Sequence, residues 1–330
     1  MPVTQIPLDS SLEQENVTLL IGKNVVLKLI EDQESKSLLN DQHVQKFLAT
    51  EDLAFRDFRK TMDKIMELET KTFLEPTREM REIFIIRRIM SRRKRMPKNL
   101  IALIKSRSRK IYKDFLEVSK NMLELEKKLK KINSEVEVLN PITLSACPAC
   151  KIPFYHERSG KMEFLLGDYK EALRCPTCDT LVNRDDVERI NIVKVIPSIE
   201  KVWKRNLWFE EYMASIVRSL EGWRTWTSVY VLGMSGVLHE VDVLAIKDGY
   251  VLIGECKTGK VKREDVFTFW TKVSDVKSHI SLFASISELP ETETRGFLQK
   301  NPSVTLLEKV GELRKSEILQ KMREGVIRRI

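Results

Sequence analysis

The stretch "HEVDVLAIKDGYVLIGECKTGK", residues 239–260, consists of two short apolar runs that are joined by Lys-Asp-Gly. The Asp-Gly pair is typical of a tight hairpin turn, so the two runs are predicted to be neighbouring antiparallel strands. Because successive side chains of a strand point to opposite faces, Glu240 and Asp242 are expected to share a face, as are Glu255 and Lys257. The chain therefore places carboxylates and an ammonium group within strands that otherwise have the composition of a buried sheet.

The pairing predicted for this hairpin brings Asp242 close to Glu255. Two carboxylates in apolar strands repel each other and are costly to remove from water unless a cation lies between them. Oxygen ligands suit a hard divalent ion, so we expect Mg²⁺ or Mn²⁺. Lys257 would point to the same cluster, where it could position or deprotonate a metal-bound water and stabilise negative charge on a phosphate. The pattern thus predicts phosphodiester hydrolysis.

A helix is predicted just upstream, in "NLWFEEYMASIVRSL", residues 206–220. Its apolar side chains recur at helical spacing, and two glutamates, Glu210 and Glu211, fall early in it. Either glutamate could complete the surroundings of the metal. A further helix is predicted in "FTFWTKVSDVKSHISLF", from which Lys272 or Lys277 could face the same site.

The order of these elements resembles a known family of nucleases. A helix with an early glutamate, a strand with an aspartate, and then Glu-x-Lys resemble the PD-(D/E)xK superfamily, which has the restriction-endonuclease-like fold. The similarity covers about residues 200–290. Within the superfamily the chain looks most like Mrr-type enzymes, archaeal Holliday-junction resolvases and CRISPR-associated nucleases switched on by cyclic oligonucleotides. The resemblance implies a metal-dependent endonuclease, with DNA favoured over RNA as the substrate.

The resemblance also implies roles for individual residues. Asp242 and Glu255 would bind the catalytic Mg²⁺ or Mn²⁺ with their carboxylates, and the main-chain carbonyl of Cys256 would be a further ligand. Lys257 would be the catalytic lysine. Glu210, which follows an aromatic residue as in many relatives, matches the helix glutamate of the family better than the glutamate after it.

The sequence departs from the family in two places. The proline that names the motif is absent, since Glu240 and Val241 precede Asp242. The N-terminal half shows no nucleotide-sensing Rossmann-like domain, so activation by a cyclic oligonucleotide is not carried over. Three alternatives stay open: an ordinary salt-bridged edge of a sheet, an inert nuclease fold that serves as a nucleic-acid-binding or assembly factor, and a coiled-coil adaptor.

Cys-Pro-x-Cys occurs twice, and the two pairs are separated by 24 residues. Each such turn presents two thiolates, and two turns close a tetrahedral site that suits Zn²⁺, here from Cys147, Cys150, Cys175 and Cys178. Four thiolates leave no open position for water or substrate, so the expected role of the zinc is structural. The pattern resembles zinc ribbons of nucleic-acid enzymes over roughly residues 144–183. Iron in a rubredoxin-like site, or two disulfides, are the alternatives.

A strongly basic run extends from Arg87 to Lys113, with twelve Lys or Arg and no acidic residue. A solvated helix face explains such a run, but these charges also attract a phosphate backbone, because neutralising phosphates releases counterions. We expect nucleic-acid contact that is largely independent of base sequence. Three basic residues after the Glu-x-Lys strand could follow the same backbone. The predicted nucleic-acid-binding residues are Arg87, Arg88, Arg92, Arg93, Lys94, Arg95, Lys98, Lys260, Lys262 and Arg263.

Apolar residues ahead of the cysteines follow a seven-residue repeat from Ile101 to Leu139, broken only at Ser108. Such a repeat predicts a coiled-coil seam, and Pro97 suits the start of the helix. The partner would be an amphipathic helix predicted at about residues 41–74, folded back, or a second copy of the chain in a homodimer. Before that helix, "VTLLIGKNVVLKLI" is predicted to form a small hairpin.

Length and composition are those of a globular protein: the 330 residues suffice for two or three domains, and 42% are hydrophobic. The formal net charge of +9 favours an anionic partner such as nucleic acid. The start of the chain does not resemble a signal peptide, and no apolar run approaches the ~20 residues of a membrane helix. We therefore expect a cytoplasmic protein with no membrane contact.

The predicted fold class is an α/β restriction-endonuclease-like C-terminal domain, preceded by a zinc ribbon and an α-helical coiled-coil N-terminal region. Four ranges are expected: a hairpin plus helix in 1–75, a basic helix and coiled coil in 76–140, the zinc ribbon in 141–190, and the nuclease domain in 191–330.

Overall fold

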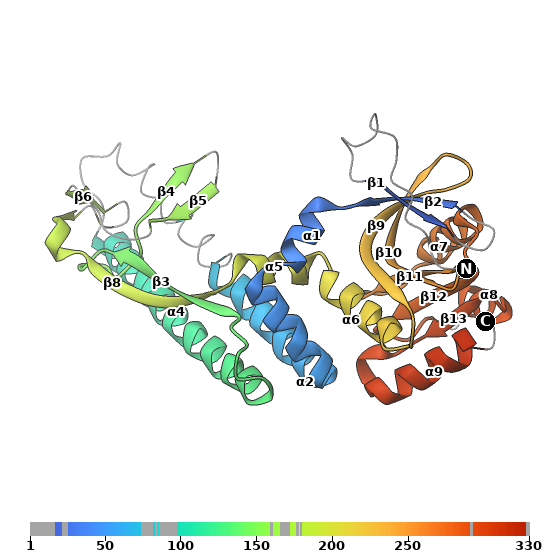
Figure 1. Cartoon of the computed structure of the whole chain (residues 1–330). Helices are drawn as coiled ribbons and strands as arrows, with labels where there is room; N and C mark the ends of the chain where they lie inside the picture. Colours follow the sequence, from blue (N-terminus) through green and yellow to red (C-terminus); the bar gives the residue numbers. More distant parts are fainter. Residues whose placement is uncertain are drawn as a thin grey trace. The chain divides into compact units, whose positions relative to one another are not determined.

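The computed structural model of the chain describes residues 17–21, 26–73, 82, 85, 98–158, 161–165, 172–175, 178, 180–290 and 293–327. The chain forms two compact units, one of residues 1–59 with 198–330 and one of residues 60–197. Each contains helices and strands, so the protein is of the mixed α/β class (Figure 1). Among the described residues, no helix is both long and apolar enough to cross a membrane.

The first unit is built on a mixed sheet of seven strands in the order β1-β2-β9-β10-β11-β12-β13. Neighbouring strands from β1 to β11 are antiparallel, and β12 and β13 continue the sheet in parallel with β11. The strands are β1 (Val17–Ile21), β2 (Val26–Glu31), β9 (Arg224–Leu232), β10 (Leu238–Lys247), β11 (Tyr250–Lys257), β12 (Ile280–Ser285) and β13 (Val304–Leu307).

The antiparallel hairpin predicted from the opening stretch is confirmed as β10 and β11. Its register pairs Val243 with Gly254 and continues to the turn. At the turn, Asp248 and Gly249 have φ angles of 48° and 82°. A two-residue turn needs left-handed backbone at both central positions to match the twist of the strands, and Asp-Gly adopts it at low cost. Local sequence therefore sets the register of this pair.

The N-terminal hairpin is also present, and it belongs to the same sheet. β1 and β2 pair with each other, and β2 then pairs with β9, with Leu29 opposite Val231. Both of these side chains are buried in the core of the unit. The sequence places this hairpin in a separate range, 1–75, whereas its strands extend the C-terminal sheet, because burying Leu29 requires a neighbouring strand.

Helices cover both faces of the sheet (Figure 1). α7 (Arg263–Val276) buries Val266, Phe269 and Val273 in the core formed with the strands, and α8 (Glu293–Lys300) lies beside it. α6 (Leu207–Arg218) packs on β9 and β10 on the other side and contacts α9 (Lys315–Ile327). The remaining helices that lie wholly or partly in this unit are α1 (Gln33–Leu39), α2 (Gln42–Phe73), α5 (Pro197–Lys204) and the short η2 (Val310–Glu312).

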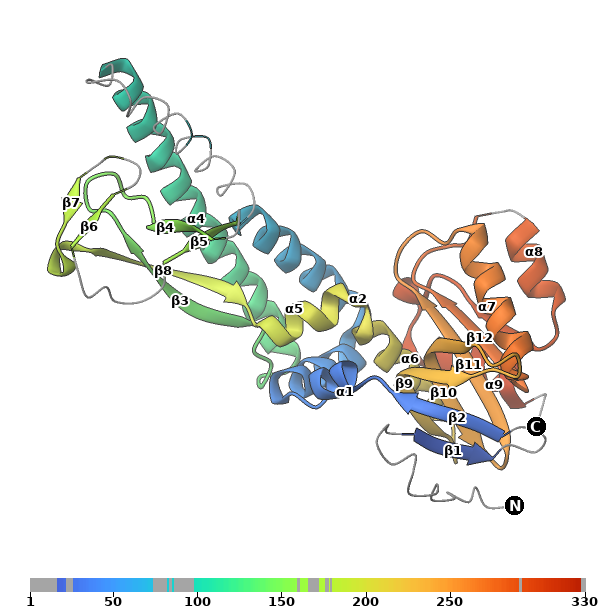
Figure 2. The same cartoon turned by 90° about the horizontal axis from the view of Figure 1, so that it is seen from above.

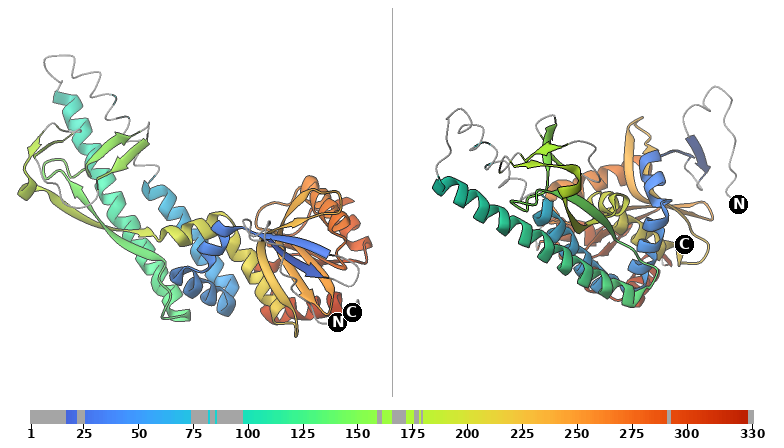
Figure 3. Two further views of the ribbon diagram at one scale, coloured as in Figure 1. Left: turned by 45° about the horizontal axis from the view of Figure 1, so that its top comes forward. Right: turned by 90° about the vertical axis from the view of Figure 1, so that its left-hand side faces the viewer.

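The second unit combines one long helix with short strand pairs, as Figures 2 and 3 show. The helix α4 (Lys98–Ile132) runs beside the antiparallel pair of β3 (Leu139–Ala146) and β8 (Glu188–Val195). The other pairs are β4 (Tyr155–Arg158) with β5 (Lys161–Phe164), and β6 (Leu173–Arg174) with β7 (Leu181–Val182). A short helix, η1 (Arg184–Asp186), precedes β8.

A coiled coil is not shown by the described residues, although α4 carries the predicted repeat. Phe115, Met122 and Leu129 are buried, and Val193 of β8 donates its N–H to the Ser119 hydroxyl at 3.4 Å. The apolar face of α4 thus packs on β3 and β8. A repeat of three and four residues marks one apolar helix face, and it does not by itself decide whether a helix or a sheet covers that face. The homodimer stays a prediction.

Candidate functional site

Glu255 lies at the centre of the predicted carboxylate cluster, and its side chain is buried near the end of β11. It is 4% exposed. Lys257 lies 2.8 Å from one carboxylate oxygen, and Lys272 of α7 lies 2.8 Å from the other. Each oxygen of Glu255 therefore has its own ammonium partner. Of the two lysines that the sequence offered on the following helix, the structure brings Lys272 to the site, whereas Lys277 is exposed at the helix end.

Asp242 lies directly beside Glu255 across the hairpin. The register pairs Val243 with Gly254, and one further step places Asp242 opposite Glu255 on the same face. The Cys256 N–H donates to Asp242 Oδ2 at 2.7 Å. Burial, and then the nearby charge of Glu255, raise the pKa of Asp242 to about 7. This carboxyl group is thus held where its charged form is disfavoured.

Glu210 brings a third carboxylate to the cluster from α6. Its side chain is 8% exposed, and its Oε2 atom has no hydrogen-bond partner in the part of the chain that the structure describes. Burial raises the pKa of Glu210 well above its usual range, and the charges of Asp242, Glu240 and Glu255 add to this rise. A buried carboxylate oxygen without a donor is rare, because desolvating it is costly.

The start of α6 is fastened to the end of β11. Asn206, the residue before the helix, has a left-handed φ of 62°, which asparagine tolerates better than most residues. Its side-chain oxygen accepts a hydrogen bond from the Thr258 hydroxyl at 2.6 Å. Thr258 directly follows β11, so this contact holds the first turn of α6, with Glu210, next to the strand that carries Glu255 and Lys257.

Glu210 and its neighbour Glu211 lie in different surroundings. Glu211 forms an ion pair with Arg218 at 3.0 Å and accepts a hydrogen bond from Thr227 at 3.2 Å. The charges of Asp242 and Glu255 contribute to the raised pKa of Glu210. Of the two glutamates, the structure thus places Glu210, the one that the family resemblance selects, near Asp242 and Glu255.

The backbone next to Asp242 is distorted. On β9 the register places Ser228 opposite Asp242, and this buried residue has a left-handed φ of 50° within the strand. Its hydroxyl oxygen lies 3.3 Å from that of Ser35, and the Ser35 hydroxyl donates to Asp32 at 2.6 Å. Asp32 is in turn paired with Arg205. Left-handed backbone in a non-glycine strand residue is strained, and such strain gathers at functional sites.

Lys257 is held by two acids. Besides Glu255, it lies 3.4 Å from Asp265 in the first turn of α7. Burial lowers the pKa of Lys257, but the charges of Glu255 and Asp265 raise it by more, so the net pKa lies above its usual value. Its ammonium group therefore stays protonated in this arrangement, which suits it for stabilising negative charge better than for removing a proton.

A divalent cation suits the chemistry of these carboxylates. Three acids converge, and one oxygen of Glu210 has no donor among the described residues. Burial, and then the neighbouring negative charges, raise the pKa values of Glu210 and Asp242. The geometry is not a closed cage, because within the described ranges only the four cysteines form a set of three or more ligand atoms that all lie within 4.8 Å of one another. Catalytic metal binding therefore stays a prediction.

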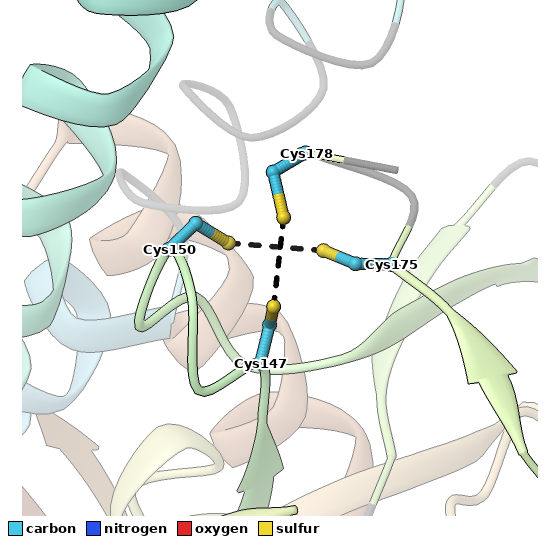
Figure 4. Close-up of side chains that lie close together, drawn as sticks. All are labelled: Cys147, Cys150, Cys175 and Cys178. Atoms are coloured by element: carbon cyan, nitrogen blue, oxygen red, sulfur yellow. Dashed lines mark hydrogen bonds between the residues drawn. The ribbon is translucent and has the colours of Figure 1, made fainter. Parts of the chain in front are cut away.

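The four predicted zinc ligands do lie together (Figure 4). The sulfur atoms of Cys147 and Cys178 are 3.5 Å apart, and those of Cys150 and Cys175 are 3.7 Å apart. In the first Cys-Pro-x-Cys segment a tight turn is closed by the Lys151 N–H, which donates to the Cys147 carbonyl at 2.8 Å. Four such thiols could hold a structural metal such as zinc, and their donor set fits it.

The predicted nucleic-acid-binding residues are only partly described. Arg87, Arg88, Arg92, Arg93, Lys94 and Arg95 lie outside the described residues, and Lys98 is the first residue of α4. Lys260, Lys262 and Arg263 are exposed and follow directly after β11. The Arg263 guanidinium lies over the Phe267 ring, 5.2 Å from its centroid. Contact with nucleic acid stays a prediction for all of them.

No family model matches the chain, and no curated protein matches it. Among solved structures it is similar to AF1548, a protein of unknown function, with 23% identity and a TM-score of 0.29 over 36% of this chain and 67% of that one. Can2 from Sulfobacillus thermosulfidooxidans, solved with cyclic tetra-adenylate, shares 19% identity with a TM-score of 0.32 over 40% of this chain and 39% of Can2. VC1899 from Vibrio cholerae shares 10% identity with a TM-score of 0.36, over 91% of this chain and 59% of VC1899. All three TM-scores are below 0.5, so these likenesses assign neither a fold nor a function.

Proposed function

We propose that this chain is a metal-dependent endonuclease that hydrolyses phosphodiester bonds, with DNA favoured over RNA. The observation that carries the proposal is the convergence of Glu210, Asp242 and Glu255 from three different elements onto one buried place next to Lys257. Ordinary folding does not favour this crowding, because burial and the neighbouring negative charges raise the cost of ionising Glu210 and Asp242. Groups perturbed in this way concentrate at active sites.

The arrangement argues against an ordinary salt-bridged edge of a sheet. β10 and β11 each have a neighbouring strand on both sides, so neither is an edge strand of the sheet. Here Glu255 is buried, and one oxygen of Glu210 has no donor in the described part of the chain. The pKa of Asp242 is raised to about 7, mainly by burial, so its lysine neighbours do not compensate for desolvation. Binding of a divalent cation would account for all three features.

The order of elements supports a restriction-endonuclease-like fold for the first unit. α6 carries Glu210, β10 carries Asp242, β11 carries Glu255 and Lys257, and α7 covers the sheet after them. This is the order in which the PD-(D/E)xK resemblance places its helix glutamate, its aspartate and its Glu-x-Lys strand. We propose membership of that superfamily on this ground.

Each residue has a distinct part in the proposed reaction. The carboxylates of Asp242 and Glu255, with the main-chain carbonyl of Cys256, would hold Mg²⁺ or Mn²⁺. When bound, such an ion polarises a phosphate and lowers the pKa of a bound water. Lys257, kept protonated by Glu255 and Asp265, would stabilise the negative charge that develops on the phosphate. Glu210 would orient the groups around the cation.

A cleavage panel tests the proposal. Single-stranded, duplex, flap and four-way-junction DNA, with matched RNA, are incubated with the chain in Mg²⁺, Mn²⁺ or EDTA. We expect internal cleavage of at least one DNA substrate in a divalent cation and none in EDTA. Binding without cleavage under every condition would contradict the proposal and favour an inert nuclease fold that acts as a nucleic-acid-binding or assembly factor.

The second unit offers a surface for the same substrate. A hollow of about 540 Å³ lies along one stripe of α4 and is lined by Ala102, Ser106, Arg109, Lys110 and Lys113. All five are exposed, and none of the described residues that line the hollow is acidic. A phosphate backbone suits such a stripe, because each phosphate that a lysine or arginine neutralises releases counterions.

Removing the charge of this stripe is expected to weaken DNA binding. In a variant with Arg109, Lys110 and Lys113 changed to alanine, the slope of log affinity against log salt should become shallower by about 0.9 for each phosphate that is no longer neutralised. Fluorescence anisotropy with labelled duplex DNA at several salt concentrations measures both the affinity and the slope. The matched control changes three exposed lysines from the other end of the same helix, Lys120, Lys128 and Lys131. Equal weakening in the two variants would show that net charge, and not the hollow, determines binding.

A further inference from the structure

We propose that Lys272 is the resident counter-cation of Glu255 and that it competes directly with the divalent cation for this carboxylate. The inference rests on the proposed function, because it concerns the site at which the catalytic cation would bind. It assigns a role to a residue outside the Glu-x-Lys motif. Lys272 acts through Glu255, so it is a positioning residue of the site.

The contacts of Glu255 carry this inference. One oxygen accepts from Lys257 and the other from Lys272, each at 2.8 Å. Both oxygens that a cation would use therefore already have an ammonium partner. An oxygen held by an ammonium group is a poor ligand for a divalent ion, because the two positive charges repel each other at short range.

The two lysines differ in what else they contact. Lys257 also lies 3.4 Å from Asp265, so it keeps an acidic partner if it leaves Glu255. Among the described residues, Lys272 forms its ion pair with Glu255, and its charge also acts on the nearby Asp242. The side chain of Lys272 is 13% exposed, against 29% for that of Lys257. If Lys272 leaves Glu255, water can therefore hydrate its ammonium group less well than it can hydrate that of Lys257. Lys272 is therefore the more costly of the two to move and the stronger competitor.

The helix that carries Lys272 holds it in place. Val273, the next residue, is buried in the core of the sheet, as is Phe269 one turn earlier. The backbone of α7 is thus fixed on the strands, and only the flexible stem of the lysine can move. Binding of a cation to Glu255 would then turn the ammonium group of Lys272 away without displacing the helix.

Calorimetric titration with Mn²⁺ in the absence of nucleic acid tests the inference. Lys272→Met removes the charge while keeping most of the side-chain volume, and we expect it to bind Mn²⁺ about tenfold more tightly than the wild type, since a hydrogen bond between charged groups no longer has to be broken. Lys272→Arg keeps the charge and should stay within about twofold of the wild-type affinity. Lys321→Met, on the exposed face of α9, controls for a general loss of positive charge.

Thermal unfolding gives a second readout that does not depend on activity. Without Mn²⁺, Lys272→Met should unfold at a lower temperature than the wild type, because Glu255 then has one ammonium partner instead of two. Saturating Mn²⁺ should remove most of that difference, since the cation replaces the missing charge. Lys272→Gln keeps a polar side chain and serves as the second neutral variant if the methionine variant does not fold.

The outcomes separate this inference from the proposed function. Mn²⁺ binding by the wild type with equal or weaker binding by the neutral variants would overturn the competitor role alone. Absence of Mn²⁺ binding at this site in the wild type would overturn both proposals. Tighter binding in the neutral variants, with wild-type affinity in Lys272→Arg, would support the competitor role.

Discussion

Replacing Asp242 with asparagine is expected to lower the rate of Mg²⁺-dependent DNA cleavage by at least about a hundredfold. The change keeps the size of the side chain but removes a negative charge that the proposed cation needs, and a cation's contribution to stabilising a phosphate amounts to several kcal/mol. Single-turnover cleavage of the preferred substrate from the panel measures the effect. Asparagine can still accept the Cys256 N–H hydrogen bond, so the hairpin is expected to stay intact.

The matched control is Asp248→Asn in the same hairpin. Asp248 lies in the exposed turn with a φ of 48°, a conformation that asparagine also adopts readily. It should cleave at the wild-type rate. A second pair compares Glu210→Gln, expected to be strongly impaired, with Glu211→Gln, whose partners are Arg218 and Thr227. If Asp242→Asn and Asp248→Asn cleave equally well, the proposed site is wrong.

The stability of Asp242→Asn distinguishes lost chemistry from lost folding. Burial raises the pKa of Asp242 from its usual 3.8 to about 7, so the folded chain favours the protonated acid. The stability that this group contributes is present below pH 4 and is lost as pH rises towards 7, at about 1.4 kcal/mol per pH unit. Asparagine does not ionise. Without divalent cations, urea unfolding should therefore show the variant to be more stable than the wild type at pH 8 and equally stable near pH 4.

Replacing Cys175 with serine is expected to abolish binding of the structural metal and to unfold the strands around it. Zinc bound by four thiolates contributes about 10–16 kcal/mol in small zinc modules, which exceeds the stability of most domains. Cys147, Cys150 and Cys175 lie in the same core as Ile111 and Phe115 of α4, so loss of the metal should also loosen that helix. Elemental analysis gives the zinc content per chain, and limited proteolysis reports the local unfolding.

The fifth cysteine supplies the control for this experiment. Cys256 is buried in the sheet of the first unit and does not belong to the four-thiol set. Cys256→Ala should keep one zinc per chain and the wild-type proteolysis pattern. If chelation of the wild-type protein leaves both its melting and its proteolysis unchanged, the metal has no structural role.

Features that depend on neighbours in the chain were predictable from the sequence. The Asp-Gly turn sets the register of β10 and β11, and the alternation of side chains then places Asp242 beside Glu255. The Cys-Pro-x-Cys spacing likewise identified the four cysteines whose thiols lie together, although the chain must fold back over 24 residues to join the two pairs. In the hairpin a short-range backbone preference determines the geometry.

Features that depend on distant partners were decided by the tertiary structure. The N-terminal hairpin extends the C-terminal sheet because Leu29 needs an apolar neighbour, and Val231 supplies it. The apolar face of α4 is covered by β3 and β8, and its seven-residue repeat does not encode that choice. Lys272 approaches Glu255 because Phe269 and Val273 pack in the core and fix α7 against the strands. Local sequence thus determined that Asp242 and Glu255 meet, whereas long-range packing, in which many partners compete for each apolar surface, decided which helices bring Glu210 and Lys272 to them.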